Sequence, residues 1–319
     1  SAHDDGSARV WDLQQGVCVA TLRHPGKVLD VEFSPGGETL VTSCDPGDLA
    51  IASGDSAFGW NWREAPDAPL FTLPQTGSRS TYAITYSPAG DTIATASLHG
   101  DVILWDANTG DEIDHCQTGF GIDNVLWSED GSGLLLLSAS RRFYWALDHE
   151  PPRRLFGHQG PVLWASFSPD GARALTASAD GSAKVWSVAD SRCLTTLAHD
   201  DVVRWAEFSP NGEAILTGCD DGSARLWRGA ERVATITPPE GAVTHGRFLD
   251  DQRIVTAMEN GDVCLWNSRG ERLRHWRGHV GSIQQIRVEP RRQVVASAGS
   301  DGSTRLWSPG QDDPLMIID

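Results

Sequence analysis

Short apolar runs alternate with polar turns along the whole chain, and no stretch of it has helical periodicity. Residues 157–186 show the pattern, because the runs VLWASF, RALTAS and AKVW are separated by a Ser-Pro-Asp-Gly turn and an Asp-Gly turn. Runs of this length between Gly, Pro and Asp are typical of β-strands. Pro presets φ, and Gly supplies the positive φ that closes a tight hairpin. The pattern therefore predicts an all-β chain of short antiparallel strands.

The same pattern returns about every 40 residues, which is the sequence signature of a repeat architecture. Each repeat closes on a Trp, and in the regular ones an Asp lies 6 residues earlier, a Ser or Thr 10 earlier and a His 28 earlier. Three repeats keep all four positions: His158, Thr176, Asp180 and Trp186; His199, Thr217, Asp221 and Trp227; His279, Ser297, Asp301 and Trp307.

This frame resembles the WD-repeat β-propeller family, whose four-stranded antiparallel blades repeat about every 40–45 residues. The resemblance implies a hydrogen-bond chain in each regular blade, from the Trp through the hydroxyl and the His to the turn Asp. Such a chain suits the chemistry, because an indole N–H can only donate and a carboxylate can only accept. These twelve residues are accordingly assigned a structural role.

The resemblance also implies one propeller domain over residues 1–319, with a partial blade at 1–24 and seven blades over 25–319. We expect a ring of seven blades, or of eight if upstream residues complete the partial one. The chain begins inside a repeat, with Ser1, Asp5 and Trp11 at the expected offsets. We therefore expect it to be the propeller portion of a larger multidomain signalling protein with further domains upstream.

Several repeats depart from the frame. Residues 44–58 are interpreted as an insertion, after which either Trp60 or Trp62 closes the repeat. Asp45, Asp48 and Asp55 in this insertion favour a solvated loop over a weak calcium site. The repeats ending at Trp105, Trp145 and Trp266 have lost the His and have other residues at the Asp position: His99, Ala139 and Asn260.

Composition excludes several classes of function. The net charge of −17 argues against a nucleic-acid surface, which needs clustered Lys and Arg, and it favours basic partners. Six scattered Cys favour a reducing compartment, so a cytoplasmic location is expected. No apolar run has the about 20 residues of a membrane span.

No cofactor, metal site or catalytic site is predicted. The chain has no nucleophile elbow and no phosphate-binding Gly loop. Five histidines lie off the repeat offsets, and none has a second His or Cys at metal-ligand spacing: His99, His115, His149, His245 and His275.

The resemblance places partner binding on the face that carries the loops before the first strand and between the second and third strands. Trp, Tyr and Arg are enriched at binding hot spots, and acidic residues on that face suit a basic partner. The candidate partner-binding residues are Trp164, Arg204, Trp205, Tyr82, Asp30, Asp123, His245, Gln285, Asp220 and Glu259. For the two Trp, the alternative is a place in the core between blades.

We expect a non-enzymatic scaffold or sensor module that binds a peptide or protein surface. One alternative is a small-molecule or enzymatic site in the central channel, for which Asp30, Asp123 and His245 would be the polar groups. Another is a purely structural domain that dimerises a larger signalling protein.

Overall fold

The computed structural model describes residues 1–12, 15–45, 55–74, 81–119, 121–138, 141–146, 153–155, 157–289 and 293–318. All regular elements in these ranges are β-strands. The described ranges contain no helix that could cross a membrane. The strands form the four-stranded antiparallel sheets of a β-propeller, as predicted. By their internal contacts the residues divide into two compact units, Ser1–Arg154 and Leu155–Asp319.

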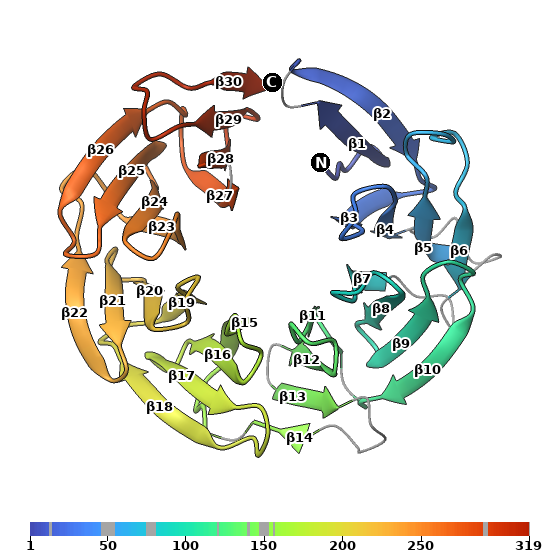
Figure 1. Cartoon of the computed structure of the whole chain (residues 1–319), viewed down its shortest axis with the longest axis horizontal. Helices are drawn as coiled ribbons and strands as arrows, with labels where there is room; N and C mark the ends of the chain where they lie inside the picture. Colours follow the sequence, from blue (N-terminus) through green and yellow to red (C-terminus); the bar gives the residue numbers. More distant parts are fainter. Residues whose placement is uncertain are drawn as a thin grey trace. The chain divides into compact units, whose positions relative to one another are not determined.

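In the first unit, β1 and β2 pair with each other, and the later strands form four-stranded sheets in chain order (Figure 1). The strands are β1 (Ser7–Asp12) and β2 (Val17–Arg23); β3 (Lys27–Phe33), β4 (Leu40–Asp45), β5 (Asp55–Trp60) and β6 (Phe71–Pro74); β7 (Thr81–Tyr86), β8 (Thr92–Ser97), β9 (Asp101–Asp106) and β10 (Glu112–Gln117); β11 (Asn124–Trp127), β12 (Gly133–Ser138), β13 (Arg141–Ala146) and β14 (Arg153–Arg154).

The second unit repeats this arrangement, and in each unit the first strand of a sheet lies on the inner side of the arc that the sheets follow (Figure 1). Its strands are β15 (Val162–Phe167), β16 (Arg173–Ser178), β17 (Ser182–Ser187) and β18 (Cys193–Ala198); β19 (Val203–Phe208), β20 (Ala214–Cys219), β21 (Ala224–Arg228) and β22 (Glu231–Ile236); β23 (Val243–Phe248), β24 (Arg253–Met258), β25 (Asp262–Asn267) and β26 (Arg272–Arg277); β27 (Ile283–Glu289), β28 (Val294–Gly299), β29 (Thr304–Trp307) and β30 (Met316–Ile318).

The core lies between successive sheets of each unit. β20 is buried along its whole length, because the neighbouring sheets β15–β18 and β23–β26 cover both of its faces. β12 is also buried along its whole length. One cluster joins Ala94 and Val102 of one sheet to Val125, Leu134 and Leu136 of the next. Burial on both faces explains why the inner strands are nearly continuous apolar runs, whereas the outer β18 is mostly exposed.

The structure resolves the closing residue of the first complete repeat. Trp60 is 2 % exposed and occupies the closing position, whereas the indole of Trp62 donates to the Gly37 carbonyl oxygen at 3.1 Å. Residues 46–54, which contain most of the predicted insertion and Asp48, lie outside the described residues, as do Ala139 and His149.

Trp205 is a core residue, and its interpretation as an exposed contact residue is wrong. It is 3 % exposed, and its indole donates to the Thr244 carbonyl oxygen at 2.9 Å. Two glycines make room for the ring, because a Cβ atom at Gly218 or at Gly246 would overlap its atoms. The alternative that placed this Trp between the blades is therefore the right one.

We expect Gly218→Ala to lower the free energy of unfolding by about 1–3 kcal/mol, because the added methyl overpacks the Trp205 ring. Thermal and urea denaturation would measure the loss. Gly36→Ala is the control, because no atom lies within 4 Å of a Cβ there and its φ is not positive. The loss at Gly218 should shrink in a Trp205→Leu background, and an equal loss in both backgrounds would contradict this packing.

Candidate functional site

The frame residues of two regular blades form the expected hydrogen-bond chain. Thr176 Oγ1 receives the Trp186 indole N–H at 2.8 Å and contacts His158 Nε2 at 2.7 Å. The other ring nitrogen of His158 lies 2.8 Å from the Asp180 carboxylate. His279 has the same contacts, with Ser297 at 2.8 Å and Asp301 at 3.0 Å, and Trp307 donates to Ser297 at 2.8 Å.

The turn carboxylates of these two blades carry strongly lowered pKa values. Burial raises the pKa of Asp180, but hydrogen bonds from Ser182, the Gln159 N–H and His158 outweigh it and hold the pKa at about 2. At Asp301 burial is likewise outweighed, by the Val280 N–H, His279 and Ser303, and the pKa lies well below its ordinary value. These carboxylates therefore stay ionised and hold their turns closed.

The third regular blade departs from the predicted chain. His199 Nε2 contacts Thr217 at 2.8 Å, but its Nδ1 contacts the Leu197 carbonyl oxygen at 3.1 Å and not Asp221. Asp221 instead accepts from Arg225 at 2.5 Å. Burial lowers the pKa of His199 to about 4, and the positive charge of Arg225 contributes to the shift. The imidazole is therefore neutral at pH 7. The cationic side chain has replaced the His as the donor to the turn carboxylate.

Two blades without the frame His use a different pair, which the sequence analysis did not find. His115 on β10 lies 3.3 Å from Asp101, and His275 on β26 lies 2.7 Å from Asp262. Both Asp residues lie four positions before their closing Trp, where the regular blades have Ser182, Ser223 and Ser303. This shared substitution, together with a His on the fourth strand, was the available signal.

A hollow of about 590 Å³ in the second unit gathers six of the ten candidate partner-binding residues. They come from successive first strands, β15, β19 and β23, and from the turns that follow β20 and β24. The six are Trp164, Arg204, Trp205, Asp220, His245 and Glu259. Leu163, which lies beside Trp164 and is 40 % exposed, also lines the hollow.

The rim of this hollow carries one ion pair, and one carboxylate that has no partner among the described residues. Arg204 donates from Nε and Nη2 to the two oxygens of Asp220, each at 2.7 Å. Glu259 is exposed, and its carboxylate has no hydrogen-bond or ion-pair partner among the described residues. The rim therefore has a surplus of negative charge over an apolar floor.

Trp164 forms that floor and is partly buried. The guanidinium of Arg247 lies 5.0 Å from the centre of its ring, and Arg247 also donates to Glu207 at 2.5 Å. The indole N–H is buried and has no acceptor among the described residues, and the same is true of Nδ1 of the adjacent His245. Burial lowers the pKa of His245, so its imidazole is uncharged at neutral pH.

The remaining candidates do not join this hollow. Tyr82, Asp30 and Asp123 belong to the first unit, and Gln285 lies on β27. The carboxylate of Asp30 accepts from the Val31 N–H at 2.9 Å and the Ile84 N–H at 3.4 Å, so it links neighbouring strands. This use is structural and weakens the alternative of a polar site built from Asp30, Asp123 and His245. Within the described ranges, no three His, Cys, Asp or Glu residues are grouped as metal ligands.

Five segments of the chain match the family model described as WD domain, G-beta repeat. They are residues 16–51, 68–106, 149–187, 191–228 and 270–308. The chain is 27 % identical to eukaryotic translation initiation factor 3 subunit I of Aspergillus terreus, over 95 % of this chain and 72 % of that protein. It is 30 % identical to periodic tryptophan protein 2 of Saccharomyces cerevisiae, over 95 % of this chain and 36 % of that protein.

Solved structures share the fold. Sqt1 of Chaetomium thermophilum, bound to the N-terminus of the ribosomal protein L10, has a TM-score of 0.77 at 17 % identity, over 93 % of this chain and 88 % of that one. The computationally designed Ika8 protein also has a TM-score of 0.77, at 19 % identity, over 96 % of this chain and 91 % of that one.

We expect Asp180→Ala to lower the free energy of unfolding by about 1–3 kcal/mol at pH 7, because it leaves buried donors unpaired. The folded pKa of about 2 lies below the ordinary value of 3.8, so the carboxylate stabilises the fold above about pH 4. That contribution is lost as the pH falls toward 2, so the difference between the two proteins should shrink there. Urea denaturation at both pH values would measure it, with the exposed Asp313→Ala as control. A difference that did not change with pH would contradict this role.

Proposed function

The chain belongs to the WD-repeat family, and from that premise we propose that it is a non-catalytic interaction module that binds a peptide or protein segment at the hollow beside Trp164. The observation that carries the proposal is the convergence in one hollow of residues chosen by their repeat register. An apolar floor inside a polar rim is the usual anatomy of a protein-binding site.

The charges of the hollow favour a partner segment with a basic residue. Arg204 and Asp220 neutralise each other, and the open carboxylate of Glu259 remains. The surplus of negative charge on the whole chain adds a long-range attraction for such a partner. The solved relative that holds the N-terminus of a ribosomal protein supports a peptide as the kind of ligand.

The same family membership supports a scaffold role in the cytoplasm, with residues 1–319 as one propeller domain. We propose a ring of seven blades. The alternative is a ring of eight, because β1 and β2 form half of a further blade. A closed ring leaves no open sheet edge, which is the general reason for propellers to close.

A phage-displayed library of random peptides, selected on the intact chain, would test the proposed site. We expect the selected peptides to be enriched in Arg or Lys beside an apolar residue. Leu163→Ala should weaken their binding about tenfold, which is the effect of removing a hot-spot side chain. Glu259→Gln should weaken it about threefold, as expected for an exposed ion pair with the basic residue. Isothermal titration calorimetry with the synthesised peptides would give the dissociation constants.

The matched controls lie in the same unit, away from the hollow. Leu194 on β18 is 55 % exposed and Glu231 on β22 is exposed, so Leu194→Ala and Glu231→Gln make the same chemical changes. These controls should bind as the unchanged chain does. Equal weakening by control and test variants, with all of them folded, would contradict the choice of this hollow.

A further inference from the structure

Within each unit, the turn after the first strand of one sheet lies against the same turn of the next sheet. The Pro of one turn faces a Gly of the other: Pro35 faces Gly90, Pro88 faces Gly131, and Pro169 faces Gly212. The distances from the Pro Cδ to an ideal Cβ on the Gly are 3.1, 3.8 and 3.4 Å. The junction of Pro88 with Gly131, between β7–β10 and β11–β14, is therefore the loosest of these three.

The other two junctions are filled by side chains of the chain itself. At the first, Thr39 and Tyr86 join their hydroxyl groups at 3.1 Å. At the one in the second unit, the guanidinium of Arg173 lies 5.0 Å from the centre of the Phe208 ring and donates to the Gly212 carbonyl oxygen at 2.9 Å. An arginine that stacks on an aromatic ring is thus one way in which this fold closes such a junction.

Thr92 occupies the corresponding position at the loose junction. In each case the carbonyl oxygen of the residue accepts the N–H of the serine that opens the turn: Thr39 from Ser34, Thr92 from Ser87, and Arg173 from Ser168. The hydroxyl of Thr92 turns to Asp91 at 3.2 Å, so it does not cross the junction.

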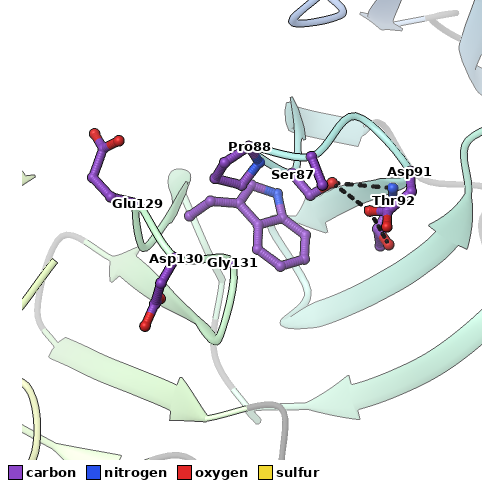
Figure 2. Close-up of a pocket in the computed structure, with 9 residues that line it drawn as sticks. Ser87, Pro88, Asp91, Thr92, Glu129, Asp130 and Gly131 are labelled. Atoms are coloured by element: carbon purple, nitrogen blue, oxygen red, sulfur yellow. Dashed lines mark hydrogen bonds between the residues drawn. The ribbon is translucent and has the colours of Figure 1, made fainter.

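Trp127 takes the place of Tyr86 and Phe208 at the end of the first strand. Its indole N–H is buried and has no acceptor among the described residues. The result is a pocket of about 510 Å³, lined by Pro88, Ala89, Thr92, Trp127 and Gly131 together with acidic residues (Figure 2). The chain leaves open here the space that Arg173 fills in the second unit.

Carboxylates surround this pocket. Glu129 and Asp130 lie on one side of it and Asp91 on the other, with Pro88 between them (Figure 2). Glu129 stands where four other turns have Pro35, Pro88, Pro169 and Pro210, and its carboxylate has no partner among the described residues. The described lining residues include no Lys, Arg or His.

We propose that this pocket is a second recognition site, which takes the side chain of an arginine from a basic segment of a partner protein. The guanidinium stacks on the Trp127 ring, as that of Arg173 does on Phe208, and donates to the carboxylate of Glu129. Asp91, whose Oδ1 accepts the hydroxyls of Ser87 and Thr92, adds negative charge on the other side of the pocket. A planar guanidinium suits this pocket better than a lysine ammonium, because it stacks on an aromatic face and donates to carboxylates in the same plane.

The test uses the whole chain with nitrogen-labelled tryptophan indoles, titrated with a blocked oligo-arginine peptide. The Trp127 indole resonance, assigned as the one missing from Trp127→Phe, should shift and saturate. Glu129→Gln should raise the dissociation constant about threefold, as expected for an exposed ion pair. Glu213→Gln removes the same charge from the corresponding turn of β19–β22 and should change the constant less.

A substitution that fills the pocket gives the sharper test. Thr92→Arg places an arginine at the position that corresponds to Arg173. It should therefore raise the melting temperature, and oligo-arginine should no longer shift the Trp127 resonance of this variant. Leu194→Arg adds the same charge on the outer β18 and should preserve that shift. Both variants report on the pocket independently of the hollow beside Trp164, so failure here leaves the proposed function standing.

Three results would overturn the proposal. One is a Thr92→Arg variant that binds oligo-arginine as the unchanged chain does. Another is an equal saturating shift with oligo-lysine of the same length, because this would assign the effect to charge alone. The third is a Trp127 resonance that responds to calcium ions and not to oligo-arginine.

Discussion

A hydroxyl buried between two sheets must find a hydrogen-bond donor, and the closing tryptophan supplies it in every four-stranded blade whose closing side chain is described. The indole N–H donates to a Thr or Ser on the second strand, at 2.8 or 2.9 Å. The pairs are Trp60 with Thr42, Trp105 with Thr95, Trp186 with Thr176, Trp227 with Thr217, Trp266 with Thr256, and Trp307 with Ser297. Because leaving such a group unpaired costs about 1–3 kcal/mol, this bond fixes where the third strand lies against the second.

The His and Asp of the frame are less constrained than this pair. They act at the edge of the sheet, where a turn carboxylate needs donors and several side chains can supply them. His158 supplies one to Asp180, and Arg225 supplies one to Asp221. In the blade with Asn at the turn position, His275 on the fourth strand pairs instead with Asp262 at the start of the third strand. The chemistry of the turn is thus preserved while the residues that perform it change.

The sequence predicted the strands, their four-stranded sheets and the frame residues, because strand periodicity and a fixed repeat offset are local properties. It also indicated six residues of the hollow, because equivalent positions on successive first strands face the same side. It could not decide the burial of Trp205, which depends on Gly218 and Gly246 on neighbouring strands. The Asp262–His275 pair was missed because the repeat frame has a Ser at the position of Asp262 and assigns no residue to the fourth strand.

The proposed arginine pocket lies where the repeat departs from its own pattern, whereas the regular positions of its frame are committed to the fold. In a repeat protein the regular blades act as an internal reference for each irregular one. The turn at Glu129 lacks the proline that four other turns have, the first strand before it ends in Trp127, and the preceding sheet carries Thr92 where Arg173 stands in another. Each change alone is a surface substitution of small effect. Together they give a junction that has an aromatic ring and nearby carboxylates but no arginine of its own. We propose that this combination is complementary to the side chain of an arginine from a partner.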